Sequence, residues 1–326
     1  MSARDVILVT GGAGFIGSHF ARAAYEADSE VIVLDDLSGA LGWPQLPDGI
    51  ARVRGDVAER EFITDVIKGR GVTSIVHFAG KICVGESVKN PALYYESNVT
   101  CALALLDSVR ESGLRKFLFS STAAVYGIPD ITPIRETAPQ RPVNPYGATK
   151  LAVEHALASY GSAYGITWGA LRYFNAAGAH PDGTLCEDHE PETHLIPLAI
   201  DASLKRKPPL TIFGSDYKTR DGSAIRDYIH VCDLASAHLA ALDALDTGRS
   251  IGALNLGTGR GYTVLEVIQA AHDLGIQVPH AFGPRRDGDP VSLIASADRA
   301  AIVLGWKPVR SDLPTILEDT LRSRAL

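Results

Sequence analysis

Short apolar runs alternate with helix-like stretches over the first half of the chain. The runs, several of them rich in β-branched residues, predict buried strands at residues 6–9, 31–34, 74–78, 115–120 and 167–174. The stretches between them predict helices at residues 17–27, 62–68, 92–111 and 146–160. This alternation indicates βαβ units, and therefore a parallel sheet that helices cover on both faces.

The pattern of predicted elements changes after about Ala176. Loops lengthen, proline and glycine become more frequent, and only short strands are expected, at residues 210–213 and 253–256. We therefore predict an α/β protein in two parts. Residues 1–176 are expected to form a Rossmann-type doubly wound parallel sheet, and residues 177–326 a smaller C-terminal α/β substrate domain, with some later segments returning to the first domain.

Composition narrows the range of partners. The 326 residues are 46% hydrophobic and carry a formal net charge of −7, so no general surface for nucleic acid or for an anionic membrane is expected. The four cysteines lie far apart without a C-x-x-C pair, which favours reduced thiols in the cytoplasm. The apolar run at residues 6–9 is too short for a signal peptide, and no run of eighteen apolar residues predicts a membrane span.

A glycine-rich turn joins the first predicted strand to the first predicted helix. Gly11, Gly14 and Gly17 have the spacing that lets a chain turn tightly and a diphosphate approach the backbone at the N-terminus of a helix. Asp35 ends the next predicted strand, where its carboxylate would accept hydrogen bonds from an adenosine ribose and repel a 2′-phosphate. The turn therefore predicts NAD rather than NADP. Asp56 is either a turn residue or a second carboxylate near the adenine.

Tyr146 and Lys150 are one turn apart on a predicted helix, which Asn144 and Pro145 would begin. A phenol is a poor base at neutral pH, and lowering its pKa to about 7 takes ~3 units, or ~4 kcal/mol. We expect the ammonium of Lys150 and an oxidised nicotinamide to lower it together. A hydroxyl at the end of the strand near residues 120–122 is a candidate to orient the reacting oxygen.

With these motifs in place, the chain resembles the extended short-chain dehydrogenase/reductase superfamily, and within it the family of UDP-glucose 4-epimerases. The similar segments run nearly end to end: GGAGFIGSH (11–19), HFAG (77–80), VGES (84–87), SSTAAVYG (120–127), NPYGATK (144–150), LRYFNAAGAHPDG (171–183), IFGSDYKTRDGSAIRDYIHV (212–231), NLGTG (255–259) and PRRDGD (284–289). The resemblance implies that Tyr146, helped by Thr122 and Lys150, takes the proton of a sugar 4-hydroxyl. Hydride passes to NAD, the 4-keto sugar turns over, and hydride returns to its other face, which interconverts UDP-galactose and UDP-glucose.

The resemblance also assigns ligand contacts. The implied cofactor-binding residues are Gly11, Gly14, Phe15, Ile16, Gly17, Asp35, Asp56, Val57, Phe78, Ala79, Gly80, Asn98, Ser120, Tyr146, Lys150 and Phe174. The implied substrate-binding residues are Thr122, Asn175, His194, Leu195, Phe213, Arg226, Tyr228, Arg286, Asp289 and Leu293. A homodimer is implied too, through the helices at residues 92–111 and 146–160. Leu103, Leu106 and Leu157 would suit its interface, although core packing explains them equally well.

Three positions depart from the family pattern. Lys81 directly follows HFAG, where the family often has its lysine one residue later, and Ile82 takes that place. His194 stands where the family often has asparagine, and Leu293 falls at the position that gates the 2-substituent of the sugar. A 4-epimerase of UDP-N-acetylhexosamines, UDP-pentoses or UDP-uronates therefore stays open.

Other readings are less favoured. A nucleotide-sugar 4,6-dehydratase needs an extra acid after the strand-end hydroxyl, and Thr122 is followed by Ala123 and Ala124. A non-catalytic NAD-sensing protein would not need the Tyr/Lys pair. The G-x-S-x-G pattern around Ser250 is expected to be a loop, because its strand and helix come in the wrong order for a hydrolase. The acidic stretch from Cys186 to His194 is expected to be a solvated loop with no metal.

Overall fold

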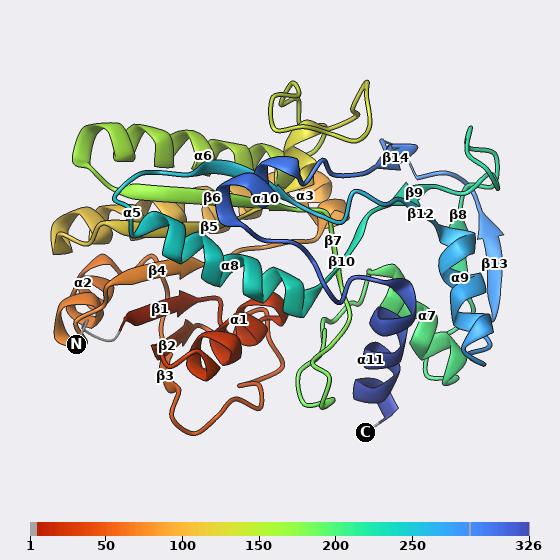
Figure 1. The fold of residues 1–326 in the computed structure, drawn as a ribbon, viewed down its shortest axis with the longest axis horizontal. Coiled ribbons are helices and arrows are strands. Elements are labelled where there is room, and N and C mark those ends of the chain that lie inside the picture. Colours follow the sequence, from red (N-terminus) through yellow and green to blue (C-terminus); the bar gives the residue numbers. More distant parts are fainter. Residues whose placement is uncertain (1–4, 287, 326) are drawn as a thin grey trace.

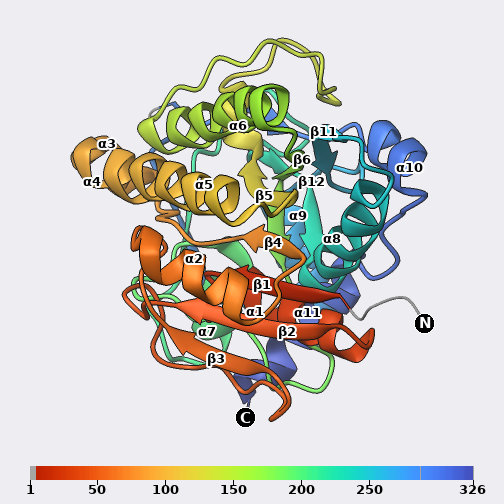
Figure 2. The ribbon, with the colours of Figure 1, turned by 90° about the vertical axis from the view of Figure 1, so that its left-hand side faces the viewer.

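The computed structural model describes residues 5–286 and 288–325, and within them a seven-stranded parallel sheet is the centre of the fold (Figures 1 and 2). Its strand order is β11-β6-β5-β4-β1-β2-β3. The strands are β1 (Val6–Thr10), β2 (Glu30–Asp35), β3 (Ala51–Arg54), β4 (Ser74–His77), β5 (Lys116–Thr122), β6 (Thr167–Tyr173) and β11 (Gly252–Leu256). The predicted Rossmann-type sheet is confirmed.

Helices cover both faces of this sheet. Successive residues of a strand point to opposite faces, and the residues on each face are apolar. Ile7 and Val9 of β1 share one buried cluster with α1 (Phe15–Glu26) and α8 (Val231–Leu245). Leu8 belongs to the opposite cluster, with α2 (Arg60–Gly69), α5 (Cys101–Ser112) and α6 (Pro145–Tyr164). Both α8 and β11 follow residue 176, so this part of the later chain lies with the first domain. The position of the domain boundary stays a prediction.

Two local features differ from the sequence expectation. The helix predicted over residues 92–111 is interrupted, with α4 (Pro91–Tyr95), a π-helical turn at Glu96–Thr100, and then α5. The turn directs Asn98 toward the loop after β4, where its side chain binds the backbone of Lys81; π-helical turns of this kind often mark functional sites. Strand β3 was not predicted, because only alternate residues of its four are partly buried.

The remaining elements build the smaller C-terminal part, at the right of Figure 1. Its short strands form three small sheets: β7 (Asn175–Ala177) with β10 (Tyr228–His230); β12 (Tyr262–Thr263), β9 (Ile225–Arg226) and β14 (Ser292–Leu293); and β8 (Leu210–Phe213) with β13 (His280–Gly283). Its helices are α7 (Leu195–Ser203), α9 (Val264–Asp273) and α11 (Leu313–Ala325). Ile200, Ile268 and Ile316 are in its core. Helix α10 (Asp298–Leu304) instead packs on α8 and β11 of the first part, where α3 (Val84–Lys89) and a 3₁₀ turn at Ala123–Tyr126 also lie.

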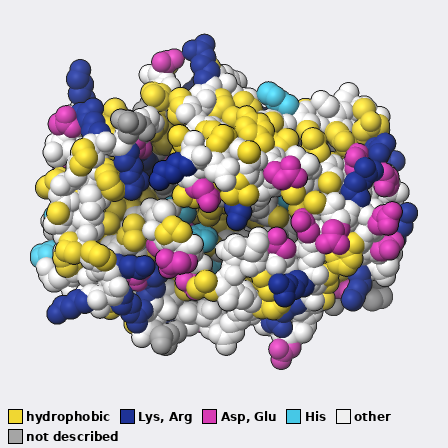
Figure 3. Space-filling view, turned by 180° about the vertical axis from the view of Figure 1, so that it is seen from behind, with side chains coloured by type: hydrophobic (Ala, Val, Ile, Leu, Met, Phe, Trp, Pro, Cys, Tyr) yellow, Lys and Arg dark blue, Asp and Glu magenta, His cyan; other side chains and the backbone are white. Residues whose placement is uncertain are grey.

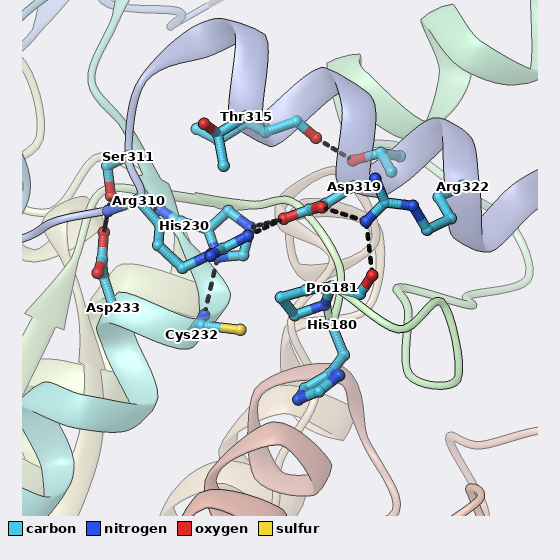
Figure 4. Close-up of polar contacts among 12 residues, drawn as sticks. His180, Pro181, His230, Cys232, Asp233, Arg310, Ser311, Thr315, Asp319 and Arg322 are labelled. Atoms are coloured by element: carbon cyan, nitrogen blue, oxygen red, sulfur yellow. Dashed lines mark hydrogen bonds and ion pairs between the residues drawn. The ribbon is translucent and has the colours of Figure 1, made fainter.

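A buried carboxylate fixes the C-terminal helix to the rest of the molecule (Figure 4). Asp319 of α11 accepts hydrogen bonds from Nε2 of His230 at 3.3 Å and from the guanidinium groups of Arg310 at 2.7 Å and Arg322 at 3.1 Å. Asp233, at the start of α8, in turn accepts from the backbone N–H of Arg310 at 2.9 Å. The network ties α11 to β10 and α8, so the two parts of the chain share one polar junction.

The surface is of mixed charge. Figure 3 shows basic and acidic side chains interspersed over the face opposite to that of Figure 1. Among residues 5–286 and 288–325, none of the helices has both the length and the apolar character needed to span a bilayer.

Candidate active site

The glycine turn packs too tightly for side chains at two of its positions. Gly11 has φ +70°, and a Cβ atom there would lie 2.4 Å from the backbone nitrogen of Ala79. A Cβ at Gly17 would lie 2.3 Å from the carbonyl oxygen of Gly11. Gly14 differs, because a Cβ there would meet only the oxygen of Gly11, at 3.3 Å.

Gly14 therefore borders open space directly before α1. It is the N-cap of that helix, no side chain caps the helix, and its first turn has no acidic residue. The free N–H groups and the positive end of the helix face this space, which fits the diphosphate of a dinucleotide.

Asp35 lies beside the same turn at the end of β2. Its carboxylate accepts hydrogen bonds from the backbone N–H of Ala13 at 3.0 Å and of Leu37 at 2.8 Å. Burial raises the pKa of this carboxyl, and the two hydrogen bonds act in the opposite direction. A carboxylate has about four lone-pair sites, so Asp35 retains the capacity to accept from ribose hydroxyls. Asp56 caps the backbone of Ala58 at 2.9 Å, beside the buried Val57.

The loop after β4 is held by Asn98. Its Oδ1 accepts from the N–H of Lys81 at 2.7 Å, and its Nδ2 donates to the carbonyl of Lys81 at 3.0 Å and to Thr149 at 3.2 Å. The protein thus already engages both polar atoms of this side chain. Through these bonds Asn98 fixes Gly80 and its neighbours next to the glycine turn.

The Tyr146–Lys150 pair begins helix α6 as predicted. Asn144 is the N-cap, its side chain accepts from the N–H of Gly147 at 2.8 Å, and Pro145 is the first helical residue. The Tyr146 phenol hydrogen-bonds Thr122, at the end of β5. Lys150 is almost completely buried, and its Nζ donates to the carbonyl of Ser120 at 3.0 Å. The structure therefore gathers all three predicted catalytic residues at one strand end.

The residues of the chain alone do not lower the pKa of the Tyr146 phenol. Burial raises the pKa of Tyr146, and the hydrogen bond with Thr122 opposes this increase. Lys150 is not among the groups that shift it, and burial lowers the pKa of Lys150 itself to about 8. The predicted lowering of the phenol pKa requires Lys150 and the nicotinamide together, so it stays a prediction. An oxidised nicotinamide would add positive charge where the chain supplies too little.

Tyr173 and His238 lie near the predicted catalytic residues but were not predicted from the sequence. The Nδ1 of His238 lies 2.7 Å from the carbonyl of Leu234, so it is the donor there, and Nε2 accepts from the hydroxyl of Tyr173 at 2.5 Å. Ser120 hydrogen-bonds the same hydroxyl, and the phenol of Tyr146 lies close enough to interact electrostatically. No motif marks this pair, because the two residues meet only through the packing of α8 on β6.

A buried ion pair was also missed. Arg172 of β6 donates to Glu154 of α6 through Nε at 2.9 Å and NH2 at 2.5 Å, and the Ser121 hydroxyl donates to the same carboxylate at 2.5 Å. Arg172 also donates to Tyr126 at 2.7 Å. The pair holds α6, the helix that carries Tyr146, against β6, and the bond from Ser121 holds it against β5, the strand that carries Thr122.

Most of the predicted substrate-binding residues lie in the C-terminal part, where several contact or pair with one another. Arg226 makes an ion pair with Asp289 and lies opposite Leu293 in the β9–β14 register. The guanidinium of Arg286 lies 3.9 Å from the ring centroid of Phe213. Tyr228, which directly follows Asp227 in the chain, is buried. It lies opposite Asn175 in the β7–β10 register.

Asp227 was not predicted, yet it fixes the segment between Arg226 and Tyr228. Its buried carboxylate accepts from the N–H groups of Thr258 at 2.9 Å, Gly259 at 3.0 Å and Ala295 at 3.1 Å. Two distant loops, one with Thr258 and Gly259 and one with Ala295, thereby meet at one side chain.

The acidic stretch corrects one expectation. Glu187 is buried, and the side chain of Glu192 is only 4% exposed, so the solvated-loop prediction is wrong for both residues. His194, the N-cap of α7 before Leu195, turns its ring toward Glu187. Ser250 lies in a loop, as predicted, with α8 before it and β11 after it.

Residues 7–257 match the model of the NAD dependent epimerase/dehydratase family, and the chain belongs to that family. A UDP-glucose 4-epimerase from Lacticaseibacillus casei is 45% identical over 314 residues, which are 96% of this chain and 94% of that protein.

Solved structures agree with this assignment. The UDP-glucose 4-epimerase from Brucella ovis in complex with NAD is 44% identical, with a TM-score of 0.92 and 97% of each chain covered. The UDP-glucose 4-epimerase from Bifidobacterium longum in complex with NAD+ and UDP is 36% identical, with a TM-score of 0.92 and 98% of each chain covered. The family resemblance and the fold predicted from the sequence are confirmed.

Proposed function

We propose that this protein is an isomerase, a 4-epimerase that interconverts UDP-galactose and UDP-glucose with tightly bound NAD. The observation that carries the proposal is the hydrogen-bonded Tyr146–Thr122 pair beside the buried Lys150. The same Rossmann-type sheet also carries the open space at Gly14, which fits a dinucleotide diphosphate. The UDP-glucose 4-epimerases reported above support the same activity.

In this mechanism, Tyr146 is the acid and base. Its phenolate takes the proton from the sugar 4-hydroxyl, and Thr122 keeps the phenol oxygen in place through their hydrogen bond. The ammonium of Lys150, held by the carbonyl of Ser120, would hold the cofactor and stabilise the phenolate of Tyr146. When bound, NAD would supply reversible hydride transfer at C4 of the sugar, on one face and then on the other. Tyr146 then returns the proton, so each cycle leaves NAD unchanged.

The substrate half of the site supplies groups that suit a uridine diphosphate. Arg226 and Arg286 carry guanidinium groups that bind phosphates through charge-assisted hydrogen bonds. Phe213, already stacked on Arg286, offers a second aromatic face. These contacts, together with Asn175, Leu195, Tyr228, Asp289 and Leu293, are predictions.

Two alternatives are separated by particular residues. Ala123 and Ala124 follow Thr122, and neither side chain can donate the proton that expels a 6-hydroxyl, which disfavours a 4,6-dehydratase. Whether the site accepts a different UDP-sugar depends on the space that Leu293 leaves for the 2-substituent of the sugar.

We further propose a cytoplasmic homodimer. The four cysteines are free, as suits a reducing compartment. Leu106 and Leu157, considered above for the dimer interface, are fully buried in the core of the single chain. Leu103, only partly buried, stays a candidate for this contact.

The test is turnover without added cofactor. Purified protein is mixed with UDP-galactose alone, and product NMR is expected to show UDP-glucose at the equilibrium ratio. A panel of UDP-N-acetylhexosamines, UDP-pentoses and UDP-uronates defines the sugar range. Acid extraction is expected to release about one NAD per chain. Protein that holds NAD but turns over no sugar on the panel would favour an NAD-sensing role instead.

A further inference from the structure

Four side chains outside the catalytic centre converge where the loop before α7 meets α11. They are Glu187, His189, Glu192 and His194, and one potential ligand atom from each lies within 4.8 Å of all the others. The described part of the chain offers no other such group of three or more. Two imidazole nitrogens and two carboxylate oxygens are a donor set that suits Zn²⁺.

The distances between these atoms lie on both sides of those in a coordination shell, so small side-chain movements would be needed to bind an ion. Tetrahedral zinc with bonds of about 2.0–2.2 Å places neighbouring ligand atoms roughly 3.3–3.6 Å apart. Nδ1 of His189 lies 3.3 Å from Oε1 of Glu187, and Nδ1 of His194 lies 3.9 Å from Oε1 of Glu192. His194 also contacts Glu187 directly.

The burial of Glu187 is the second, independent observation. Its side chain is only 3% exposed, and Oε2 has no hydrogen-bond partner although it is buried. A buried carboxylate oxygen without a partner is costly, and most such atoms bind a donor, a water molecule or an ion. Both histidines contact the other oxygen of this carboxylate, Oε1, so Oε2 is left for an additional ligand.

The negative charge around the cluster also favours a bound cation. Three carboxylates lie there with little exposure, those of Glu187, Glu192 and Asp201. Among the described residues, Arg324 is the arginine that reaches them, and it donates to both oxygens of Asp201 at 2.8 and 2.7 Å. Its distance to Glu192 is 3.5 Å. Two negative charges are thus left for the two histidines to balance, which is the charge that one divalent cation neutralises.

We propose that Glu187, His189, Glu192 and His194 bind one Zn²⁺ ion. The ring of His194 is 45% exposed, so the ion has a path from solvent into the cluster. The site immediately precedes Leu195, so a bound ion would fix the start of α7 to the loop before it.

The experiment measures binding, and its outcome does not depend on the proposed epimerase activity. Full-length protein, isolated with its NAD, is stripped of metal with a chelator and titrated with Zn²⁺ against a chromophoric competitor. We expect one Zn²⁺ per chain with a Kd below about 1 μM, and a loss of affinity of at least ~100-fold in His189→Ala. The matched control is His272→Ala, an exposed histidine outside the cluster, which is expected to bind like the wild type.

Thermal unfolding provides the second measurement. Zn²⁺ is expected to raise the Tm of the wild type and of His272→Ala, but not of His189→Ala or of Glu187→Gln, which keeps the shape of the side chain. Far-UV circular dichroism and NAD content establish that each variant is folded. No stoichiometric binding by the wild type, or equal binding by folded His189→Ala and Glu187→Gln, would overturn the proposal.

Discussion

The buried pair between Glu154 and Arg172 gives a prediction whose size follows from its geometry. Glu154→Gln removes the negative charge and leaves the guanidinium of Arg172, 1% exposed, without its counter-ion. Both bonds between the two groups, at 2.5 and 2.9 Å, are charge-assisted. Removing one partner of such a pair costs about 3–5 kcal/mol. For a chain of this length each kcal/mol lowers the Tm by about 2 °C, so we expect a decrease of about 6–10 °C.

Thermal unfolding in excess NAD, followed by circular dichroism, measures this decrease. The double variant Glu154→Met/Arg172→Met removes both charges, and we expect its loss of stability to be at least ~2 kcal/mol smaller than the sum of the two single losses. Glu111→Gln is the control, because its ion pair with Arg60 is exposed and is worth at most about 1 kcal/mol. A Tm for Glu154→Gln within 2 °C of that of the wild type would refute the reasoning.

Three further predictions concern the cofactor site and the core. Tyr146→Phe is expected to reduce kcat at least ~100-fold while NAD content stays normal. Tyr164→Phe, at the far end of the same helix, is the control. A near-normal rate for Tyr146→Phe would exclude Tyr146 as the base. Gly14→Ala places a methyl group in the open space before α1 and should reduce the NAD recovered by acid extraction at least ~10-fold; full NAD content would contradict the assignment of that space. Burial lowers the pKa of His77 to about 3, so the unfolded chain takes up a proton first as the pH falls below 6.5. Stability is therefore lost between about pH 6.5 and 3, by about 1.4 kcal/mol at pH 5.5 for this residue. Urea unfolding at pH 7.5 and 5.5 should show a decrease that is smaller by this amount in His77→Asn, and an equal decrease in both proteins would disprove the assignment.

The parts of the site that the sequence predicted are those set by neighbours close in the chain. Gly11 and Gly17 are required by a turn of a few residues, and Asn144 and Pro145 mark the start of α6 within one helical turn of Tyr146. Such local constraints leave a pattern of residue types at fixed spacing, which is visible without a structure.

The parts that were missed depend on residues brought together from distant segments. Asp227 holds loops that begin 31 and 68 positions later in the chain, and no spacing rule connects them. Glu187 and Glu192 lie in a stretch that looks solvated, but α11 supplies Arg324 against both, more than 130 residues away. The burial that raises the pKa of Tyr146 was not visible in the sequence either, because it depends on how far the surrounding fold excludes water.

The place of β11 in the sheet sets a condition on how this protein is made. It pairs with β6 over Gly252–Leu256, and α8, which precedes it, covers the face of the sheet beside α1. A ribosome that has released only the first 176 residues has therefore delivered six strands with one bare edge and one half-covered face. Such a nascent chain offers apolar surface to other proteins until about eighty more residues emerge, and a separately expressed N-terminal half would carry that exposure permanently.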